Sequence, residues 1–241
     1  MNQQIAPLIL EYRKAHPYKT STFTRSQEAN KLNDENPFAF LLCATVDRMS
    51  IAEVVWSTAF ELRKALGHLD PTTIAAMNPE DIEPLLPEGL YLRRDSARTI
   101  VDCANQVVSR WRGDASRIWA TTDVREILAR LDDIFGVGRA IASMIINILI
   151  RDGKLELPPD QLARVDVKPD THIRRVFFRT GLSEKESEKA AIDAGRKANP
   201  RYPGELDMPA WQIGREYCDP GLPHCGKCPL EKACSKRGLH S

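Results

Sequence analysis

Four of the six cysteines lie in one short segment, and this segment constrains the fold more than any other feature of the chain. Its sequence is CDPGLPHCGKCPLEKAC, from Cys218 to Cys234, with Cys225 and Cys228 between them. Thiolates at this density form two disulfides, a zinc site or an iron–sulfur cluster. The N-terminal segment contains no secretory signal, so disulfides are the least favoured. One Cys-x2-Cys pair with longer arms favours a [4Fe–4S] cluster, with zinc as the alternative.

Length and composition describe an ordinary globular protein. The chain has 241 residues, 42% of them hydrophobic, which is enough to bury a core in one or two domains. Its net charge is only +1, so nucleic-acid binding would need a local basic face. The longest apolar run, from Ile141 to Ile150, is interrupted by Ser143 and Asn147 and is too short to cross a bilayer. We expect no membrane span, and we expect Cys43 and Cys103, which lie in apolar helical patterns, to be buried thiols.

Apolar residues recur at helical spacing through most of the chain, whereas no segment alternates apolar and polar residues as a strand would. We expect helices over residues 5–16, from Pro37 onward, and over residues 94–111. Ser50 and Glu53 form a capping box, which predicts one continuous helix from residue 51 to residue 66. The expected fold class is therefore all-α.

A glycine pair at Gly136 and Gly138, separated by Val137, lies between two predicted helices. Such a pair allows a tight turn with positive φ and exposes backbone N–H groups at the start of the second helix, next to Arg139. Those amides and the helix dipole suit a DNA phosphate. Glycines present only for packing are the alternative, and a lone pair would favour it.

Asp170 follows Pro169 and should begin a helix, where its carboxylate could be a simple N-cap. The order of features along the chain changes this interpretation. A glycine hairpin comes first, then the aspartate at a helix start, then a helix with several arginines, and finally the four-cysteine loop.

In this order the segments resemble the helix-hairpin-helix superfamily of DNA glycosylases, in its endonuclease III branch. The match lies in LDDIFGVGRAIASMI for the hairpin, PDTHIRRVFFRTGL for the aspartate helix, and Cys-x6-Cys-x2-Cys-x5-Cys for the cluster loop. Weaker similarity in NPFAFLLCATVDRMSI and GLYLRRDSA extends the resemblance over most of residues 30–236. The combination of cysteine spacing, hairpin and aspartate makes the match specific.

The resemblance implies two helical lobes that flank a DNA-binding cleft. One is a helical barrel over residues 33–150 that contains the hairpin. The other is an iron–sulfur cluster domain made of residues 1–32 and 151–241, with the four cysteines as cluster ligands. Asp170 matches the catalytic aspartate, which stabilises positive charge on the sugar as the N-glycosidic bond of a flipped nucleotide breaks.

The resemblance also implies a set of residues at the DNA. The expected contacts are Gly136, Val137, Gly138, Arg139, Arg93, Arg94 and Lys227. For Arg93 and Arg94 a solvated basic patch is the alternative. Tyr91 or Leu92, beside them, is expected to be the wedge that this family inserts into the duplex. His172 is a further pocket candidate.

Two positions depart from the family pattern. Bifunctional members carry a lysine two residues after the second hairpin glycine, and here that position is Ala140. Alanine cannot form a Schiff base, so a monofunctional glycosylase is expected, with AP-lyase activity absent or weak. Lys168, two residues before Asp170, is the alternative nucleophile. Thr45 stands where endonuclease III has a glutamine that probes the duplex, and Thr45 and Asp47 are candidates for a pocket wall. A helix end with local hydrogen bonds is the alternative for these two residues.

The leading hypothesis is a DNA glycosylase of base excision repair that acts on a damaged, mismatched or modified base. A non-catalytic DNA-binding protein of the same fold, a bifunctional enzyme that uses Lys168, and a zinc-stabilised helical protein are the alternatives. The expected partner is double-stranded DNA. The protein is expected to be a monomer and to be cytoplasmic beside the nucleoid if its source is prokaryotic. The long loop over residues 151–169 is expected to reshape the pocket.

Overall fold

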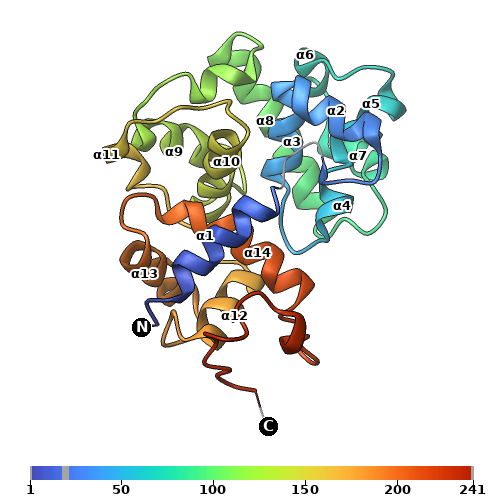
Figure 1. Ribbon diagram of the computed structural model, residues 1–241. Coiled ribbons are helices and arrows are strands. Elements are labelled where there is room, and N and C mark those ends of the chain that lie inside the picture. The colour runs from blue at the N-terminus through green and yellow to red at the C-terminus, as the bar shows by residue number, and fades with distance from the viewer. Residues whose placement is uncertain (1, 18–21, 240–241) are drawn as a thin grey trace. The chain divides into compact units, whose positions relative to one another are not determined.

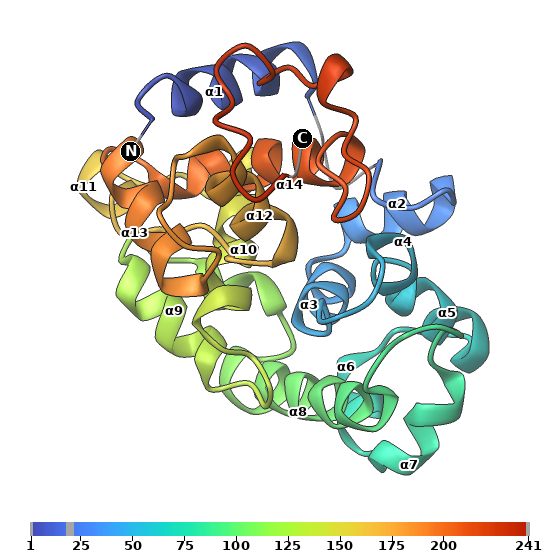
Figure 2. The same cartoon turned by 90° about the horizontal axis from the view of Figure 1, so that it is seen from below.

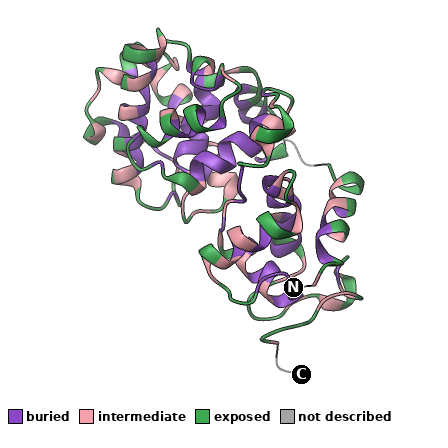
Figure 3. Cartoon of the chain, turned by 90° about the vertical axis from the view of Figure 1, so that its left-hand side faces the viewer, coloured by how far each residue is buried: buried purple, intermediate pink, exposed green. Residues whose placement is uncertain are grey.

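The computed structural model describes residues 2–17 and 22–239, and within these ranges the chain forms helices and turns without a β-strand. The expected all-α fold is confirmed. Two compact units divide the chain. We name Lys19–Leu155 the hairpin unit, and Met1–Tyr18 together with Glu156–Ser241 the cysteine unit. In each unit the buried helix faces point inward and the exposed faces point outward (Figure 3).

The helices of the hairpin unit are α2 (Gln27–Glu35), α3 (Pro37–Thr45), α4 (Ala52–Val55), α5 (Thr58–Leu66), α6 (Pro71–Ala75), α7 (Pro79–Ile82), α8 (Arg93–Trp111), α9 (Val124–Asp132) and α10 (Arg139–Arg151), with 3₁₀ turns at Glu83–Leu85 and Ala115–Trp119. Helix α3 is the centre of this unit, because every residue from Phe38 to Thr45 is buried. Asn36 begins α3 by accepting hydrogen bonds from the N–H groups of Phe38 and Ala39. Helices α2, α5, α8 and α10 pack around it.

The boundary between the units differs from the expected one. The sequence placed residues 1–32 with the cysteine loop, but α2 packs against α3 and α5, so residues 22–32 lie in the hairpin unit. Asn33 strengthens this attachment, since its buried side-chain amide donates to the carbonyl of Trp56 at 2.7 Å. The second division falls between residues 155 and 156.

The single helix expected over residues 51–66 is wrong. The chain forms α4 and α5 with a break at Trp56 and Ser57. Ser50 does not cap α4, because its hydroxyl accepts the backbone N–H of Tyr91 at 2.7 Å. The carbonyl of Trp56 is bonded to Asn33, a partner outside the helix, and this bond favours the break.

Helix α8 is confirmed to within one residue of its expected start. It runs beside α6 and α7 (Figure 2). Thr99 and Asp102 lie on one face of α8, and this face meets the segment around Gly136. The first half of α8 therefore supports the hairpin.

The cysteine unit contains α1 (Ile5–Ala15), α11 (Pro159–Leu162), α12 (Thr171–Thr180), α13 (Glu188–Ala198) and α14 (Asp207–Glu216), with 3₁₀ turns at Pro203–Leu206 and Cys225–Lys227. Helix α1 lies beside α14 although the two are far apart in the sequence (Figure 1). Tyr12 donates from its hydroxyl to Glu216 at 3.0 Å, and Arg13 pairs with Glu205 at 2.7 Å. Their apolar faces share one core with α12 and α13.

The segment between α10 and α12 is anchored in the cysteine unit along its second half. Val165 and Val167 are buried, and the carbonyl of Val165 accepts the N–H of Gly204 at 2.8 Å. Between them, buried Asp166 accepts two hydrogen bonds from Arg196, at 2.7 and 2.8 Å. These contacts fix the segment that leads into Asp170, and they therefore help to position Asp170. No helix of the described residues is long and apolar enough to cross a membrane.

Candidate active site and cysteine loop

Asp170 is the N-cap of α12, as the sequence predicts. Its Oδ1 accepts the backbone N–H of Ile173 at 2.8 Å, and its own N–H donates to the carbonyl of Lys168 at 2.7 Å. The residue is partly exposed, and the cap bond uses one of its two carboxylate oxygens. A cap of this kind holds the carboxylate in one orientation at the positive end of the helix dipole.

Lys168 forms a tight turn with Asp170. Its backbone N–H donates to the carboxylate of Asp207, the buried first residue of α14. Its side chain is half-buried. The start of α14 therefore sets the path of the chain into Asp170.

His172 is held from one side by Arg175. Nη2 of Arg175 lies 3.0 Å from Nδ1 of His172. A guanidinium can only donate, so Nδ1 accepts this hydrogen bond and the ring carries its proton on Nε2. The ring also meets Trp211 edge to face, with the centroids 6.2 Å apart. Nε2 of His172 is therefore the ring nitrogen that carries the N–H, in the first turn after Asp170.

Arg175 also connects α12 to the cysteine loop. It is 5% exposed, and it donates to the carbonyls of Thr171 at 3.2 Å, Gly214 at 3.0 Å and Cys218 at 2.5 Å. A side chain with these partners cannot contact a phosphate. Arg175 is a structural link between the residues after Asp170 and the first cysteine.

Helices α12 and α14 cross closely at Gly214. A Cβ at this position would lie 2.8 Å from Cβ of His172 and 3.1 Å from its carbonyl oxygen. Ordinary contacts are longer, so only glycine fits here without moving a helix. The crossing fixes the backbone of His172, two residues after Asp170.

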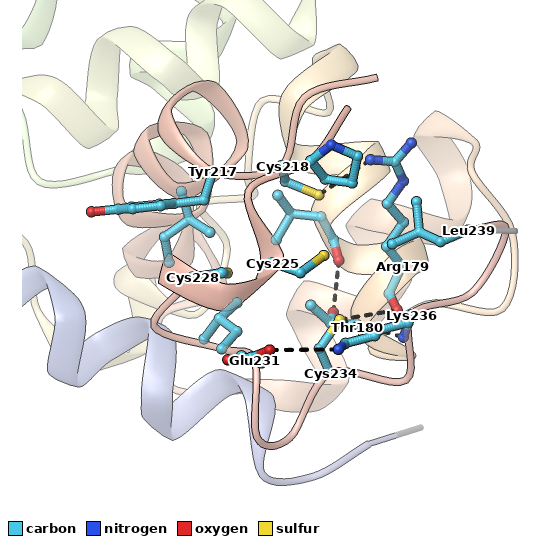
Figure 4. Close-up of a pocket in the computed structure, with 14 residues that line it drawn as sticks. Arg179, Thr180, Tyr217, Cys218, Cys225, Cys228, Glu231, Cys234, Lys236 and Leu239 are labelled. Carbon is cyan, nitrogen blue, oxygen red and sulfur yellow. Dashed lines mark hydrogen bonds and ion pairs between the residues drawn. The ribbon is translucent and has the colours of Figure 1, made fainter. Parts of the chain in front are cut away.

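The four cysteines of the loop line one cavity, with their sulfurs around a common space (Figure 4). Leu230 anchors the loop, because it is fully buried in the core of the cysteine unit. Arg179 is also buried and donates to the carbonyls of Asp219 at 2.6 Å and Pro220 at 2.8 Å. Its Nη1 lies 3.6 Å from Sγ of Cys218. Arg179, a residue of α12, therefore fixes the conformation of the loop between Cys218 and Cys225.

The pKa values of the cysteine thiols indicate a site that needs a bound positive charge. Burial, together with the charges of the other three cysteines, raises the pKa of Cys228 to about 11. Burial also raises the pKa of Cys234. Ligand thiolates need a compensating positive charge, which a metal centre supplies. Within residues 2–17 and 22–239, no group of three or more His, Cys, Asp or Glu is arranged to hold a metal ion.

The hairpin between α9 and α10 has the expected tight turn. Gly136 has φ +76°, whereas Gly138 is extended and is the N-cap of α10. Val137 is buried and ties the turn down by donating its N–H to the carbonyl of Ile134 at 3.0 Å. Gly138 and Arg139 are exposed. A glycine cap brings no side chain, so a phosphate oxygen can approach the first amides of α10.

Ala140 lies in the first turn of α10 and is half-buried. Ala140 therefore lies directly after the hairpin, two residues beyond Gly138, and its side chain is a methyl group. No amine is attached there that could attack a sugar carbon.

Two expected pocket or DNA residues have structural roles. Thr45 is fully buried, and its hydroxyl donates to the carbonyl of Leu42 at 3.0 Å, which matches the local alternative and excludes an exposed wall. Arg93 is turned inward and donates to the carbonyls of Leu86, Pro87 and Glu83 at 2.7 to 2.8 Å. Its guanidinium holds the turn before α8 and does not form part of a free basic patch.

The remaining candidates are at the surface or partly so. Asp47 is half-exposed and accepts the indole N–H of Trp56 at 3.2 Å. Arg94 and Lys227 are exposed. Tyr91 and Leu92 are 51% and 40% exposed, and the expected wedge stays a prediction.

The sequence reasoning missed Arg48 and Met49. Met49 is 79% exposed and has φ +53°, a conformation that side chains other than glycine rarely adopt. In this segment Thr45 was the expected pocket-wall residue, but Thr45 is buried and Met49 is the accessible residue. A methionine in a polar loop was the available signal.

The same arrangement of helices occurs in solved structures of DNA glycosylases. Endonuclease III in a trapped covalent intermediate with DNA matches with a TM-score of 0.70 and 21% identity, over 98% of this chain and 96% of that one. A non-covalent endonuclease III–DNA complex matches equally well. A thermostable thymine-DNA glycosylase matches with a TM-score of 0.62 and 16% identity over the same shares. No family model matches the sequence. The chain has an all-α helix-hairpin-helix fold. In particular, this is the fold of endonuclease III.

Proposed function

We propose that the protein is a DNA glycosylase of the helix-hairpin-helix superfamily, in which Asp170 promotes hydrolysis of an N-glycosidic bond. One observation carries the proposal, namely the partly exposed Asp170 carboxylate held at the start of α12 in a chain with the fold of endonuclease III. The fold alone does not imply an activity, and the position of the carboxylate is the feature that supports hydrolysis of an N-glycosidic bond.

In the proposed reaction the bond between C1′ of the sugar and the base nitrogen breaks, and the electron pair leaves with the base. Positive charge develops on the sugar ring, and the Asp170 carboxylate stabilises it. Water then adds to C1′ and loses a proton, which gives an abasic site and a free base. The N–H at Nε2 of His172 is a donor for the substrate phosphate or sugar, because Arg175 occupies Nδ1.

Ala140 supports a monofunctional enzyme. An amine at this position would attack C1′ and form the Schiff base that precedes strand cleavage, and a methyl group cannot. Lys168 is the one specific alternative, since its backbone is bonded to that of Asp170. A bifunctional reaction through Lys168 is therefore the second candidate, and borohydride trapping distinguishes it.

We propose that Cys218, Cys225, Cys228 and Cys234 hold a [4Fe–4S] cluster. The four cysteines line one cavity, and their spacing, one Cys-x2-Cys pair with longer arms, favours a cluster over one zinc ion. Bound there, the group would give the loop a rigid shape and compensate the charge of four thiolates. The chain's own contribution is Arg179 and Leu230, which hold the loop on α12 and on the core.

Double-stranded DNA is the proposed partner of a monomeric protein, in the compartment that contains the genome. The hairpin amides with Arg139, together with Arg94 and Lys227, would contact phosphates. With a net charge of only +1, binding rests on these local groups, and it should weaken steeply as salt rises.

The test is a panel of duplexes with single damaged, mismatched or modified bases, in which release of free base is measured directly. The wild type should release at least one base without nicking the strand until alkali is added, and Asp170→Asn should bind the same duplex without excision. Nicking before alkali together with a borohydride-trapped adduct that Lys168→Ala removes would establish the bifunctional reaction. If binding persists but no base is released by either protein, the chain is a DNA-binding module.

A further inference from the structure

The turn between α9 and α10 is attached to one face of α8. Asp102 of α8 accepts the backbone N–H of Phe135 at 2.8 Å. Arg48 bridges the same two segments, since it donates to the hydroxyl of Thr99 at 2.8 Å and to the carbonyl of Gly136 at 3.3 Å. A Cβ on Gly136 would lie 2.5 Å from Nη1 of Arg48, so the segments fit closely. These contacts fix the backbone of Phe135 beside α8.

Arg98 lies one helical turn before Asp102, and its guanidinium lies over the ring of Phe135. The guanidinium carbon is 4.1 Å from the centroid of the ring, which is a cation–π contact. Both partners are at the surface, because the Arg98 side chain is 53% exposed and Phe135 is 38% exposed. The turn therefore holds an exposed positive charge in one place.

The N–H donors of the Arg98 guanidinium remain available. Among the described residues its charged partner is Asp95, whose Oδ1 lies 4.0 Å from Nη1, beyond the length of a hydrogen bond. Arg93, Arg175 and Arg179, in contrast, donate to carbonyls of the protein. Immobilising an arginine costs conformational entropy, and at Arg98 no hydrogen bond from the guanidinium to the described residues offsets this cost. The arrangement is typical of a residue whose hydrogen-bond acceptor belongs to a ligand.

We propose that Arg98 binds a phosphate of the DNA strand that the hairpin contacts, and that Phe135 positions the guanidinium for this contact. This inference rests on the proposed function and deepens it. A guanidinium that stacks through its face keeps its N–H donors at the edge, in the planar fork that matches two phosphate oxygens. Because the ring of Phe135 already restricts the side chain, less entropy is lost when the phosphate binds.

A DNA phosphate is the acceptor that fits the charge of this surface. Arg94, one turn before Arg98 on α8, and Arg139, at the start of α10, are also exposed. Asp133, the C-cap of α9, is paired with Arg110 at 2.6 Å, so its charge is compensated within the protein. Every nucleotide carries a phosphate, so Arg98 should strengthen binding to a duplex of any sequence, with or without a damaged base.

The test uses Asp170→Asn protein, an undamaged duplex and a duplex with a tetrahydrofuran abasic analogue, with dissociation constants measured at several salt concentrations. Arg98→Gln should weaken binding to both duplexes by about tenfold, the effect of losing a charged hydrogen bond. It should also reduce the slope of log affinity against log salt by about one, because one phosphate contact is lost. The melting temperature should change by no more than about 2 °C, since the side chain is exposed.

Phe135→Leu tests the positioning role. It keeps an apolar side chain on the turn but removes the ring face, and it should weaken binding by about threefold. The combined variant Arg98→Gln, Phe135→Leu should bind no more weakly than Arg98→Gln alone, because the ring acts through the guanidinium. A merely structural effect of the leucine would persist in the combined variant.

Arg63→Gln is the matched control. Arg63 lies over the ring of Phe60 at 5.6 Å, a pair of the same kind in the same unit, but on α5, which packs against α2 and α3. This variant should leave both affinity and salt slope unchanged.

An unchanged salt slope in Arg98→Gln would overturn the inference, and so would losses that multiply to about thirtyfold in the combined variant. These measurements need no excision, so failure of the glycosylase proposal would appear separately, as absent base release from the panel of damaged duplexes.

Discussion

The crossing of α12 and α14 at Gly214 yields a prediction in which stability and activity respond differently. Gly214→Ala places a Cβ 2.8 Å from Cβ of His172 and 3.1 Å from its carbonyl, so the helices must separate by about 0.6 Å to reach ordinary contact at 3.4 Å. Alanine in a helix gains about 1 kcal/mol over glycine, and overpacking costs about 1–3 kcal/mol. The net destabilisation is therefore small, about 0–2 kcal/mol.

The effect on excision should be larger. The shift acts on the backbone of His172, two residues after Asp170, and a misplacement approaching 1 Å lowers a rate by about 100-fold. We expect single-turnover base release to fall by about 10- to 100-fold, with a melting temperature lowered by no more than about 5 °C. Calorimetry and single-turnover release at saturating protein measure the two quantities.

Gly195→Ala is the matched control. Gly195 is also inside a buried helix of the same unit, but its nearest neighbour is Cγ1 of Val167 at 3.6 Å, an ordinary contact. This variant should be stabilised by up to about 1 kcal/mol and should excise at the wild-type rate. If Gly214→Ala behaves in the same way, the close contact does not position Asp170 and the reasoning is refuted.

Three other perturbations follow from the site and its surroundings. Arg179→Ala removes the donors to the carbonyls of Asp219 and Pro220, so bound metal should be lost to a chelator about 10-fold faster, measured by absorbance, with helical circular dichroism retained. Equal rates would show that Arg179 is not needed by the loop. Ala140→Lys should create an adduct that borohydride traps, and its absence in an actively excising variant would contradict the proposed position of this residue. Hydrogen bonds from Thr73 lower the pKa of Asp70, so the contribution of this cap to stability is complete above about pH 4 and is lost as pH falls through the lowered value. Asp70→Asn should therefore flatten the dependence of melting temperature on pH below about pH 4, and an unchanged slope would exclude this cap as its source.

Features governed by local chemistry were predictable from the sequence. Asp170 after a proline predicted an N-cap, and the cap bond to Ile173 is present. Helix α8 and the turn at Gly136 followed from apolar spacing and from glycine in the same way. Each of these needs only interactions within a few residues.

Features governed by distant partners were not predictable. Arg93 was expected at the DNA, but its guanidinium donates to carbonyls such as that of Glu83. The guanidinium of Arg175 donates to the carbonyl of Cys218, 43 residues away. The capping box at Ser50 failed for the same reason, since Tyr91 takes its hydroxyl. A periodic pattern indicates which face of a helix is buried but not which backbone group a polar side chain will reach.

The division of the chain between the two units has a consequence for folding during synthesis. The hairpin unit is continuous, from Lys19 to Leu155, so all of its core leaves the ribosome before α12 and α14 do. Helix α1 leaves first of all, yet it buries Ile5 and Ile9 in a core that includes α14. Until α14 has left the ribosome, the apolar face of α1 lacks the residues that bury it in the native structure. We therefore expect α1 to be the segment of the nascent chain that a chaperone protects.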